Sequence, residues 1–451
     1  MLHVTDTIAA LATPAGTSAI AVVRASGPDT GRLAVEIFGL PPSPRKACHA
    51  DYRDIDGRLV DDVLFTFFQG PHSYTGEDSL EISSHGNPFI AQKILADLLT
   101  RGCRSAQPGE FTQRAFLNGQ MDLSQAEAVM DLIHARSDRA LAAANQQLRG
   151  ALGKTMDALT HRLLEVLARV EAYIDFPEED LPPEDTNWLD VELQSIAKDT
   201  QRLLATNRYG DMLREGIRTV ILGAPNAGKS SLLNQLVGRD RALVGEEPGT
   251  TRDFIEEKIL IGPHCLRLID TAGLNPSPVP LEKRGIEKTL EQAEAADVFL
   301  LVLDATQPIG ELPREFASRI TLDRTILVLN KIDLVGTEPP PAPFPARYTV
   351  HTSALNGSGL DRLREAIGSL ADSCQPEIGG ERVSINARHA EALSRAQNYL
   401  TEARGKITGH DPVELLASDL RGALGALGEI RGKIDNERVL DRLFASFCIG
   451  K

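Results

Sequence analysis

Residues 219–231 join an apolar run to a glycine-rich loop and the start of a helix. Their sequence, TVILGAPNAGKSS, contains the pattern G-x-x-x-x-G-K-[ST] from Gly223 to Ser230. Glycines in such a loop let backbone N–H groups turn toward an anion, while the lysine places a point charge on the β- and γ-phosphates. The serine hydroxyl is a ligand for Mg²⁺. We therefore predict that Lys229 contacts nucleotide phosphates and that Ser230 binds magnesium.

Two later segments supply groups that a γ-phosphate and its metal require. The polar loop from Gly245 to Asp253 contains Thr251, whose hydroxyl is a second predicted Mg²⁺ ligand. The apolar run 266–269 ends in Asp270-Thr-Ala-Gly273. There a carboxylate can hold the metal's water shell, and the Gly273 N–H can meet the γ-phosphate.

Two further segments predict which base is bound. The apolar run 325–329 ends in Asn330-Lys-Ile-Asp333, and an aspartate there can accept from both N1–H and N2–H₂ of guanine. Adenine lacks that pair of donors, so GTP is predicted over ATP. The segment Thr352-Ser-Ala354 fits a loop whose backbone N–H contacts the guanine oxygen. Each group follows an apolar strand, as expected of an α/β nucleotide-binding domain. The residues predicted to bind GTP are Asn226, Ala227, Gly228, Lys229, Ser230, Ser231, Gly245, Glu246, Glu247, Pro248, Gly249, Thr250, Thr251, Asp270, Thr271, Ala272, Gly273, Asn330, Lys331, Asp333, Ser353 and Ala354.

Composition narrows the class of protein. The chain has 451 residues, enough for two to four domains, and a formal net charge of −15. Non-specific nucleic-acid binding is not expected at that charge, so a nucleic-acid substrate would need a local basic patch or a basic partner. No run of 18 apolar residues predicts a membrane span. The N-terminus lacks a basic signal region, and the five cysteines are odd in number and scattered, which favours a cytoplasmic protein.

The helices and strands that must position these groups follow an unusual order along the chain. Residues 1–118 alternate apolar runs with turn signals, which predicts a mixed α+β domain. Helical periodicity starts near Asp122, where Ser124-Gln-Ala-Glu127 matches a capping box, and continues to about Glu215 with one acidic, proline-rich break. It resumes from Ile385. We predict a P-loop GTPase α/β domain inserted into a helical bundle. The predicted boundaries are 1–118, 119–215 for the first helical part, 216–372 for the inserted Ras-like domain, and 373–451 for the second helical part.

Further motifs, spread over the whole chain, resemble the bacterial and organellar MnmE (TrmE) family of tRNA modification GTPases. They are DTIAALATPAG near the N-terminus, Val23-Arg-Ala-Ser-Gly27, Tyr74-Thr-Gly-Glu-Asp78, Phe111-Thr-Gln-Arg-Ala-Phe116, Gly249-Thr-Thr-Arg-Asp253 and Phe447-Cys-Ile-Gly-Lys451. The resemblance implies a tetrahydrofolate-binding-like N-terminal domain that mediates homodimerisation. It also implies an FAD-containing partner, MnmG (GidA)-like, in a heterotetramer. Together they would add an aminomethyl or carboxymethylaminomethyl group to C5 of the wobble uridine in certain tRNAs, with a folate one-carbon unit.

The hydrolytic mechanism departs from that of Ras-like enzymes, in which a glutamine follows the D-x-x-G glycine and orients the attacking water. This chain has Leu274 there. Either the switch does not hydrolyse GTP, or charge and water placement come from elsewhere. The resemblance implies the second, with Glu282 orienting water beside the catalytic Lys229. It also implies a K⁺ ion in place of an arginine finger. Its implied ligands are Asn226, Gly245, Glu247 and Thr250.

For folate, the resemblance implies a site made by Arg24, Glu81, Gln120 and Lys451. A carboxylate such as Glu81 can pair with the aminopyrimidine edge of a pterin, and basic groups can meet the carboxylates of a 5-formyl or methylene tetrahydrofolate. Gln120 stands where the family commonly has lysine. Cys448 has two interpretations, a small buried apolar residue or a reactive thiol beside the folate.

Two other functions remain possible from the sequence. One is a regulatory GTPase of ribosome assembly, but such proteins usually carry an RNA-binding module and a basic charge balance. The other is a folate-sensing scaffold with a vestigial GTPase, which the completeness of the nucleotide motifs disfavours. Measured GTP turnover separates the scaffold from the enzymes.

Overall fold

The computed structural model describes residues 6–39, 42–175, 183–240, 256–270, 294–307, 321–335, 346–374, 383–409, 411–432, 443–445, 447 and 449–450. The chain divides into two compact units. The first combines residues 1–130, 153–164 and 424–451, and the second combines residues 131–152 and 165–423. Each unit therefore gathers segments that are distant in sequence.

The first unit contains a six-stranded sheet with the strand order β3-β4-β5-β2-β1-β6. Neighbouring strands are antiparallel except for the parallel pair β1 and β6. The apolar runs noted in the sequence fall in β2, β4 and β5, which confirms the predicted α+β character. The strands are β1 (Ile8–Leu11), β2 (Ile20–Ser26), β3 (Ala47–Arg53), β4 (Leu59–Phe68), β5 (Ser79–His85) and β6 (Arg104–Ser105).

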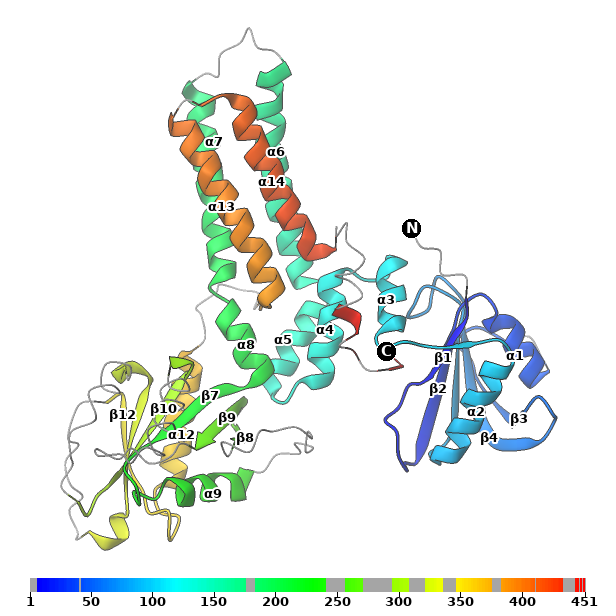
Figure 1. Cartoon of the computed structure of the whole chain (residues 1–451), viewed down its shortest axis with the longest axis horizontal. Coiled ribbons are helices and arrows are strands. Elements are labelled where there is room, and N and C mark those ends of the chain that lie inside the picture. The colour runs from blue at the N-terminus through cyan, green and yellow to red at the C-terminus, as the bar shows by residue number, and fades with distance from the viewer. Residues whose placement is uncertain are drawn as a thin grey trace, which may run out of the picture. The chain divides into compact units, whose positions relative to one another are not determined.

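Two helices cover one face of this sheet, α1 (Thr30–Phe38) and α2 (Pro88–Thr100) (Figure 1). Their buried Leu33 and Ile94 join Val23 and Ile82 of the strands in one apolar cluster. Because side chains alternate along a strand, the residues next to Val23 and Ile82 face the opposite side. Arg24 and Glu81 occupy those positions.

The C-terminal residues of the first unit pack beside its third helix, α3 (Glu110–Leu117). Phe444 and Phe447 share an apolar cluster with Phe116 and residues of the following helix. Gly109 precedes α3 with φ 69°, and a Cβ there would lie 2.6 Å from the Phe444 carbonyl oxygen. This approach requires glycine, so the residues around Gly109 and the C-terminal residues pack closely within this unit.

The capping box of the next helix, α4 (Leu123–His134), lies two residues earlier than the sequence predicted. The Gln125 backbone N–H donates to Asp122 Oδ1 at 2.9 Å, and the Asp122 N–H donates to Gln125 Oε1 at 2.9 Å. The prediction that Ser124 and Glu127 form the box was wrong. Ser124 is buried and its hydroxyl donates to Asp122 instead.

The second unit contains the other sheet, with the order β12-β11-β10-β7-β9-β8. Its strands are parallel except for β8, which is antiparallel to β9. The strands of this sheet are β7 (Ile217–Leu222), β8 (Glu256–Ile261), β9 (His264–Asp270), β10 (Val298–Asp304), β11 (Thr325–Asn330) and β12 (Tyr348–His351). The four strands predicted from the nucleotide motifs are among them, as β7, β9, β11 and β12.

Both faces of this sheet are apolar, as parallel strands require. On one face, Leu232 of α9 (Lys229–Asp240) and Ile367 of α12 (Leu360–Ser373) pack on Ile221 and Val328. Val220 and Leu327 contribute to a second cluster on the other face. The carboxyl ends of the parallel strands meet at one edge, where the polar groups of the nucleotide motifs collect.

Long helices precede and follow this sheet in the chain. Before it come α4, α5 (Asp138–Leu148), α6 (Ala151–Asp175), α7 (Pro183–Leu204) and α8 (Asn207–Glu215), and after it α13 (Ala387–Gly409) and α14 (Val413–Arg431). Figure 1 shows α7 and α13 side by side, and Arg404 of α13 pairs with Asp190 of α7 at 2.8 Å. The GTPase-like sheet is thus inserted between helices that pack together. Within the described ranges, no helix combines the length and apolar character needed to cross a membrane.

Candidate functional site

The phosphate loop connects β7 to α9 and holds its lysine in place. Lys229 is 8% exposed, and its Nζ donates to the carbonyl oxygens of Gly223 at 3.2 Å and Ala224 at 3.0 Å. Burial lowers the pKa of Lys229, and the negative charge of Asp270 opposes that shift. Because both of its hydrogen bonds to described residues go to neutral carbonyls, the ammonium group has charge to offer an incoming phosphate.

Both motif glycines are required by close packing. A Cβ at Gly223 would lie 2.2 Å from the Val302 carbonyl oxygen, and one at Gly228 would lie 2.2 Å from Asn330 Nδ2. Between them Asn226 takes a left-handed backbone conformation, with φ 63°, which asparagine tolerates better than most residues. Its exposed side chain lies on the loop.

The predicted magnesium groups meet at the start of α9. Ser230 Oγ donates to Asp270 Oδ2 at 2.8 Å, and the other oxygen, Asp270 Oδ1, is buried with no hydrogen-bond partner among the described residues. A buried, unpaired carboxylate oxygen beside a hydroxyl fits a hard cation such as Mg²⁺. The structure therefore brings Ser230 and Asp270 together, and their predicted roles at a magnesium ion stay predictions.

Asn330 ties the base-recognition segment to the phosphate loop. It is 1% exposed, and its Nδ2 donates to the Ala227 carbonyl oxygen at 2.9 Å. Its Oδ1 accepts from the Ala354 N–H at 3.0 Å and from the Thr352 hydroxyl at 3.3 Å. Ser353 is also fully buried behind this loop.

A cavity of about 530 Å³ opens next to this junction. Asp333, in the short 3₁₀ turn Ile332–Leu334, lies at its wall with the backbone of Ala354, so the two predicted base contacts share one cavity. Its lining residues are Gly228, Ser231, Asn234, Gln235, Asn330, Lys331, Asp333, Leu334, Ala354 and Leu355. A purine edge entering this cavity would meet an acceptor and a backbone loop, as guanine requires.

Asp304 belongs to this site although the sequence analysis did not select it. Lys331 Nζ lies 2.7 Å from Asp304 Oδ2. Burial alone would raise the pKa of Asp304, but hydrogen bonds from Lys331 and Thr306 outweigh it and lower the pKa. Its position in the sequence could have revealed it, because Asp304 ends the apolar strand β10 as Asp270 ends β9.

The other predicted site lies on the face of the first sheet opposite α1 and α2. Arg24 and Glu81 are directly opposite on β2 and β5, with Arg24 Nη2 2.7 Å and Nε 3.0 Å from Glu81 Oε1. Arg24 Nη1 also donates to the Gly450 carbonyl oxygen at 3.5 Å. The rings of Tyr74 and Phe111 lie 5.7 Å from the Arg24 guanidinium carbon. The C-terminal tail thus reaches the Arg24–Glu81 pair, as expected.

Gln120 lies beside the segment that carries Tyr74. A Cβ on Gly76 would approach Gln120 Nε2 to 3.1 Å, and the Gln120 side chain is exposed. Tyr74 was named in the sequence analysis only as part of a motif. Its position over Arg24 makes it a further candidate for the site.

Two family models match the chain, the MnmE helical domain over residues 123–448 and the GTP-binding protein TrmE N-terminus over residues 7–120. The chain belongs to the MnmE family.

MnmE relatives match over nearly the full length. The tRNA modification GTPase MnmE of Opitutus terrae is 59% identical over 447 residues, covering 99% of both chains. That of Akkermansia muciniphila is 45% identical over 450 residues, again covering 99% of both. Among solved structures, the G domain of the T. maritima FeoB iron transporter matches 34% of this chain and 98% of its own, at 24% identity and a TM-score of 0.25, too low to bear on function.

Membership of the MnmE family confirms the predicted fold class and the predicted activity, a tRNA modification GTPase. It does not test the individual residues. Several predicted site residues lie outside the described residues, and their positions stay predictions. They are Gly245, Glu246, Glu247, Pro248, Gly249, Thr250, Thr251, Thr271, Ala272, Gly273, Glu282, Cys448 and Lys451, together with Leu274.

Proposed function

We propose that this MnmE-family chain is a potassium-activated GTPase that modifies certain tRNAs. With an FAD-containing, MnmG-like partner it installs the aminomethyl or carboxymethylaminomethyl group at C5 of the wobble uridine, using a tetrahydrofolate one-carbon unit. The observation that supports this most is the meeting of Arg24, Glu81 and the Gly450 carbonyl in a chain that also carries a complete phosphate loop. Full-length family matches favour it over a ribosome-assembly GTPase or a folate-sensing scaffold.

GTP binding follows from the geometry of the loop. Lys229 supplies the point charge for the phosphates, Ser230 and Asp270 hold Mg²⁺ with Thr251, and Asp333 accepts from the guanine edge. The GTPase domain is proposed to span residues 216–372, the range that contains every described residue of the nucleotide site.

For hydrolysis, Asn226 is the described residue that supports a potassium site. Its carboxamide is exposed on the phosphate loop, and an amide oxygen is a suitable ligand for a hard cation. A bound K⁺ would neutralise charge that develops at the β–γ bridge, where other GTPases use an arginine. Gly245, Glu247 and Thr250 are its other proposed ligands. Glu282 orients the water.

For folate, the paired Arg24 and Glu81, on the sheet face opposite α1 and α2, supply one positive and one negative group. Glu81 accepts from the aminopyrimidine edge of the pterin. Among the described residues, the Nη1 of Arg24 makes a single long bond, to a neutral carbonyl, so it is available to a carboxylate. Lys451 directly follows Gly450 and adds a second positive charge. Gln120 and the Cys448 thiol complete the proposed site.

The partner and the substrate follow from the family assignment together with charge. At a formal net charge of −15, this chain needs help to hold a polyanion. We infer that the tRNA is held largely by the MnmG-like partner, in a cytoplasmic complex built on a homodimer of this chain.

Reconstitution tests the whole proposal. Purified chain, FAD-containing partner, tRNA, GTP, MgCl₂, KCl, methylene-tetrahydrofolate and a nitrogen donor (ammonium or glycine) are combined, and the tRNA nucleosides are analysed by mass spectrometry. Modified wobble uridine should form only in the complete mixture. Modification that persists without folate or without GTP would contradict the proposal.

A further inference from the structure

The segment 70–78, which joins β4 to β5, is held at both ends. The Gly70 N–H donates to Asp78 Oδ1 at 2.9 Å, and the Gly27 N–H donates to the Asp78 carbonyl oxygen at 3.0 Å. The Ser73 hydroxyl donates to the Glu77 carbonyl oxygen inside the segment. A connection this closely bonded can present a side chain in one fixed orientation.

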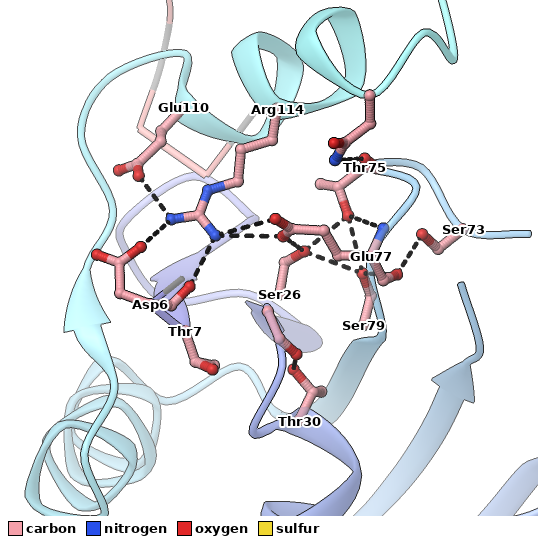
Figure 2. Close-up of polar contacts among 12 residues, drawn as sticks. Asp6, Thr7, Ser26, Thr30, Ser73, Thr75, Glu77, Ser79, Glu110 and Arg114 are labelled. Carbon is pink, nitrogen blue, oxygen red and sulfur yellow. Dashed lines mark hydrogen bonds and ion pairs between the residues drawn. The ribbon is translucent and has the colours of Figure 1, made fainter. Parts of the chain in front are cut away.

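Arg114 of α3 forms ion pairs with three carboxylates, one of which belongs to segment 70–78. It is 2% exposed, and its guanidinium Nη2 lies 2.7 Å from Asp6 Oδ1 and 3.0 Å from Glu110 Oε1. Its Nη1 lies 3.2 Å and 3.3 Å from the two oxygens of Glu77. Figure 2 shows the guanidinium between these carboxylates, which come from the start of the sheet, from the 70–78 segment and from α3 itself.

A second set of hydrogen bonds holds Glu77 from its other side. The Ser26 hydroxyl donates to Glu77 Oε2 at 2.8 Å and lies 2.7 Å from the Thr75 hydroxyl. Asn118 Nδ2 donates to the Thr75 carbonyl oxygen at 2.7 Å. Glu77 is therefore fixed between β2 and α3, and the backbone around it is fixed as well (Figure 2).

Tyr74 is the residue that this network places at the ligand site. Its hydroxyl lies 2.9 Å from the Thr112 hydroxyl, two residues before Arg114 on the same helix. Its side chain is 36% exposed, and its ring lies 5.7 Å from the Arg24 guanidinium carbon. The ring thus remains accessible beside the Arg24–Glu81 pair.

We propose that Arg114 is a positioning residue. Through Glu77 it holds segment 70–78 so that the ring of Tyr74 lies next to Arg24 and packs on a flat heteroaromatic ligand. This rests on the proposed folate function, whose reduced pterin keeps one such flat ring, the aminopyrimidinone, and it adds Tyr74 to the groups that contact it.

The chemistry requires arginine at this position. Its planar fork reaches three carboxylates from three segments at once, whereas a lysine ammonium keeps the charge but cannot span them. A purely structural ion pair would affect stability alone. A positioning residue also affects how tightly the folded protein binds its ligand.

The test compares full-length Arg114→Lys with Arg101→Lys, a matched control. Arg101 is another arginine of the same sheet domain, with its side chain 9% exposed and paired to Asp97, but it caps the C-terminal end of α2, in a different element from segment 70–78. Hydrogen exchange of peptides covering 70–78 and calorimetric titration with 5-formyl-tetrahydrofolate are both measured below the unfolding temperature. Arg114→Lys should speed exchange and weaken binding about tenfold each, while Arg101→Lys should change neither.

A second variant separates positioning from contact. Tyr74→Leu removes the ring but not the network, so binding should weaken while exchange of the segment stays slow. If Arg114→Lys does not fold, Glu77→Gln replaces it, since that change weakens the same tie and nearly keeps its shape.

Different results would contradict the role of Arg114, the contact by Tyr74 and the folate function. Unchanged binding in Arg114→Lys, with or without faster exchange, would overturn the positioning role. Unchanged binding in Tyr74→Leu would remove the ring from the site. Absence of binding by the unaltered protein would overturn the folate function and this inference's ligand, while the exchange rates would still show whether Arg114 holds the segment.

Discussion

The side-chain amide of Asn330 donates a hydrogen bond to the carbonyl oxygen of Ala227 at 2.9 Å, across 103 residues of sequence. This bond joins the segment that selects the base to the loop that binds the phosphates. Because Asn330 is also bonded to Ala354, these hydrogen bonds fix the distance between the two halves of the site.

Base selectivity should therefore depend on a single carboxylate. Asp333→Asn replaces an acceptor with an amide that can donate, so preference should shift from GTP toward XTP, which has a carbonyl where guanine has an amine. Competition binding with GTP, ATP and XTP measures this, with the exposed Asp361→Asn on α12 as control. An Asp333→Asn protein that still prefers GTP would exclude Asp333 from the base site.

The Arg114 cluster predicts acid sensitivity in the first unit. Burial alone would raise the pKa of Glu110, but hydrogen bonds from Arg104, the Gln107 N–H and Arg114 outweigh it and lower the pKa below its usual 4.5. The unfolded chain then takes up this proton first as pH falls. The stabilisation is complete above pH 4.5 and is lost as pH falls through the lower, folded value.

Glu110→Gln removes that titration and leaves its arginine partners less compensated, so it should cost about 3 kcal/mol at pH 7. The difference from the unaltered protein should shrink below about pH 4.5. Urea unfolding followed by hydrogen exchange in α3 peptides, from pH 7 to 3.5, measures both. A difference that is independent of pH would show that Glu110 is not ionised in the cluster.

Much of the nucleotide site could be predicted from the sequence. The run 325–329 became β11 because an unbroken apolar run between polar residues is typical of a buried parallel strand. Asp270 and Ser230 could be paired because their motifs end and begin elements that meet at one sheet edge. Asp304 shows the limit, since an aspartate after an apolar strand was present but had no motif around it.

Other features depend on the path of the chain and could not be derived. Asp122–Gln125 and Ser124–Glu127 both fit a capping box, and only the structure chooses the first. Arginine is usually exposed, so nothing in its residue type revealed that Arg114 would be buried. The bond from Arg24 to Gly450 spans 426 residues, and only the family resemblance had indicated that the C-terminal tail comes near Arg24.

GTP turnover should depend on the monovalent cation. If Asn226 helps to bind K⁺, hydrolysis should be much faster in KCl than in NaCl of equal ionic strength. Asn226→Ala should remove the difference by lowering the rate in KCl. Phosphate release in both salts measures this, and equal rates for the unaltered protein would refute the potassium site.

Nucleotide binding and GTP hydrolysis should depend on two different residues, Lys229 and Glu282. Lys229→Ala should weaken GTP binding roughly 100-fold, because the phosphates lose a charge-assisted contact. Glu282→Ala should keep the affinity and reduce turnover about 100-fold, as expected when a water-orienting group is lost. Fluorescent-nucleotide titration and single-turnover hydrolysis distinguish them. Normal hydrolysis by Glu282→Ala would assign the water to another residue.

The central claim is that this chain uses its GTPase site and its folate site to modify tRNA. The direct measurement is mass spectrometry of wobble uridines from cells in which the gene for the protein is deleted. These cells carry either no replacement, the unaltered chain, Lys229→Ala, Glu81→Ala or the exposed control Arg58→Ala. Modification should be lost without the protein, restored by the unaltered chain and the control, and absent with Lys229→Ala and Glu81→Ala. Fully modified uridine in cells lacking the protein, or full restoration by both site variants, would contradict the account.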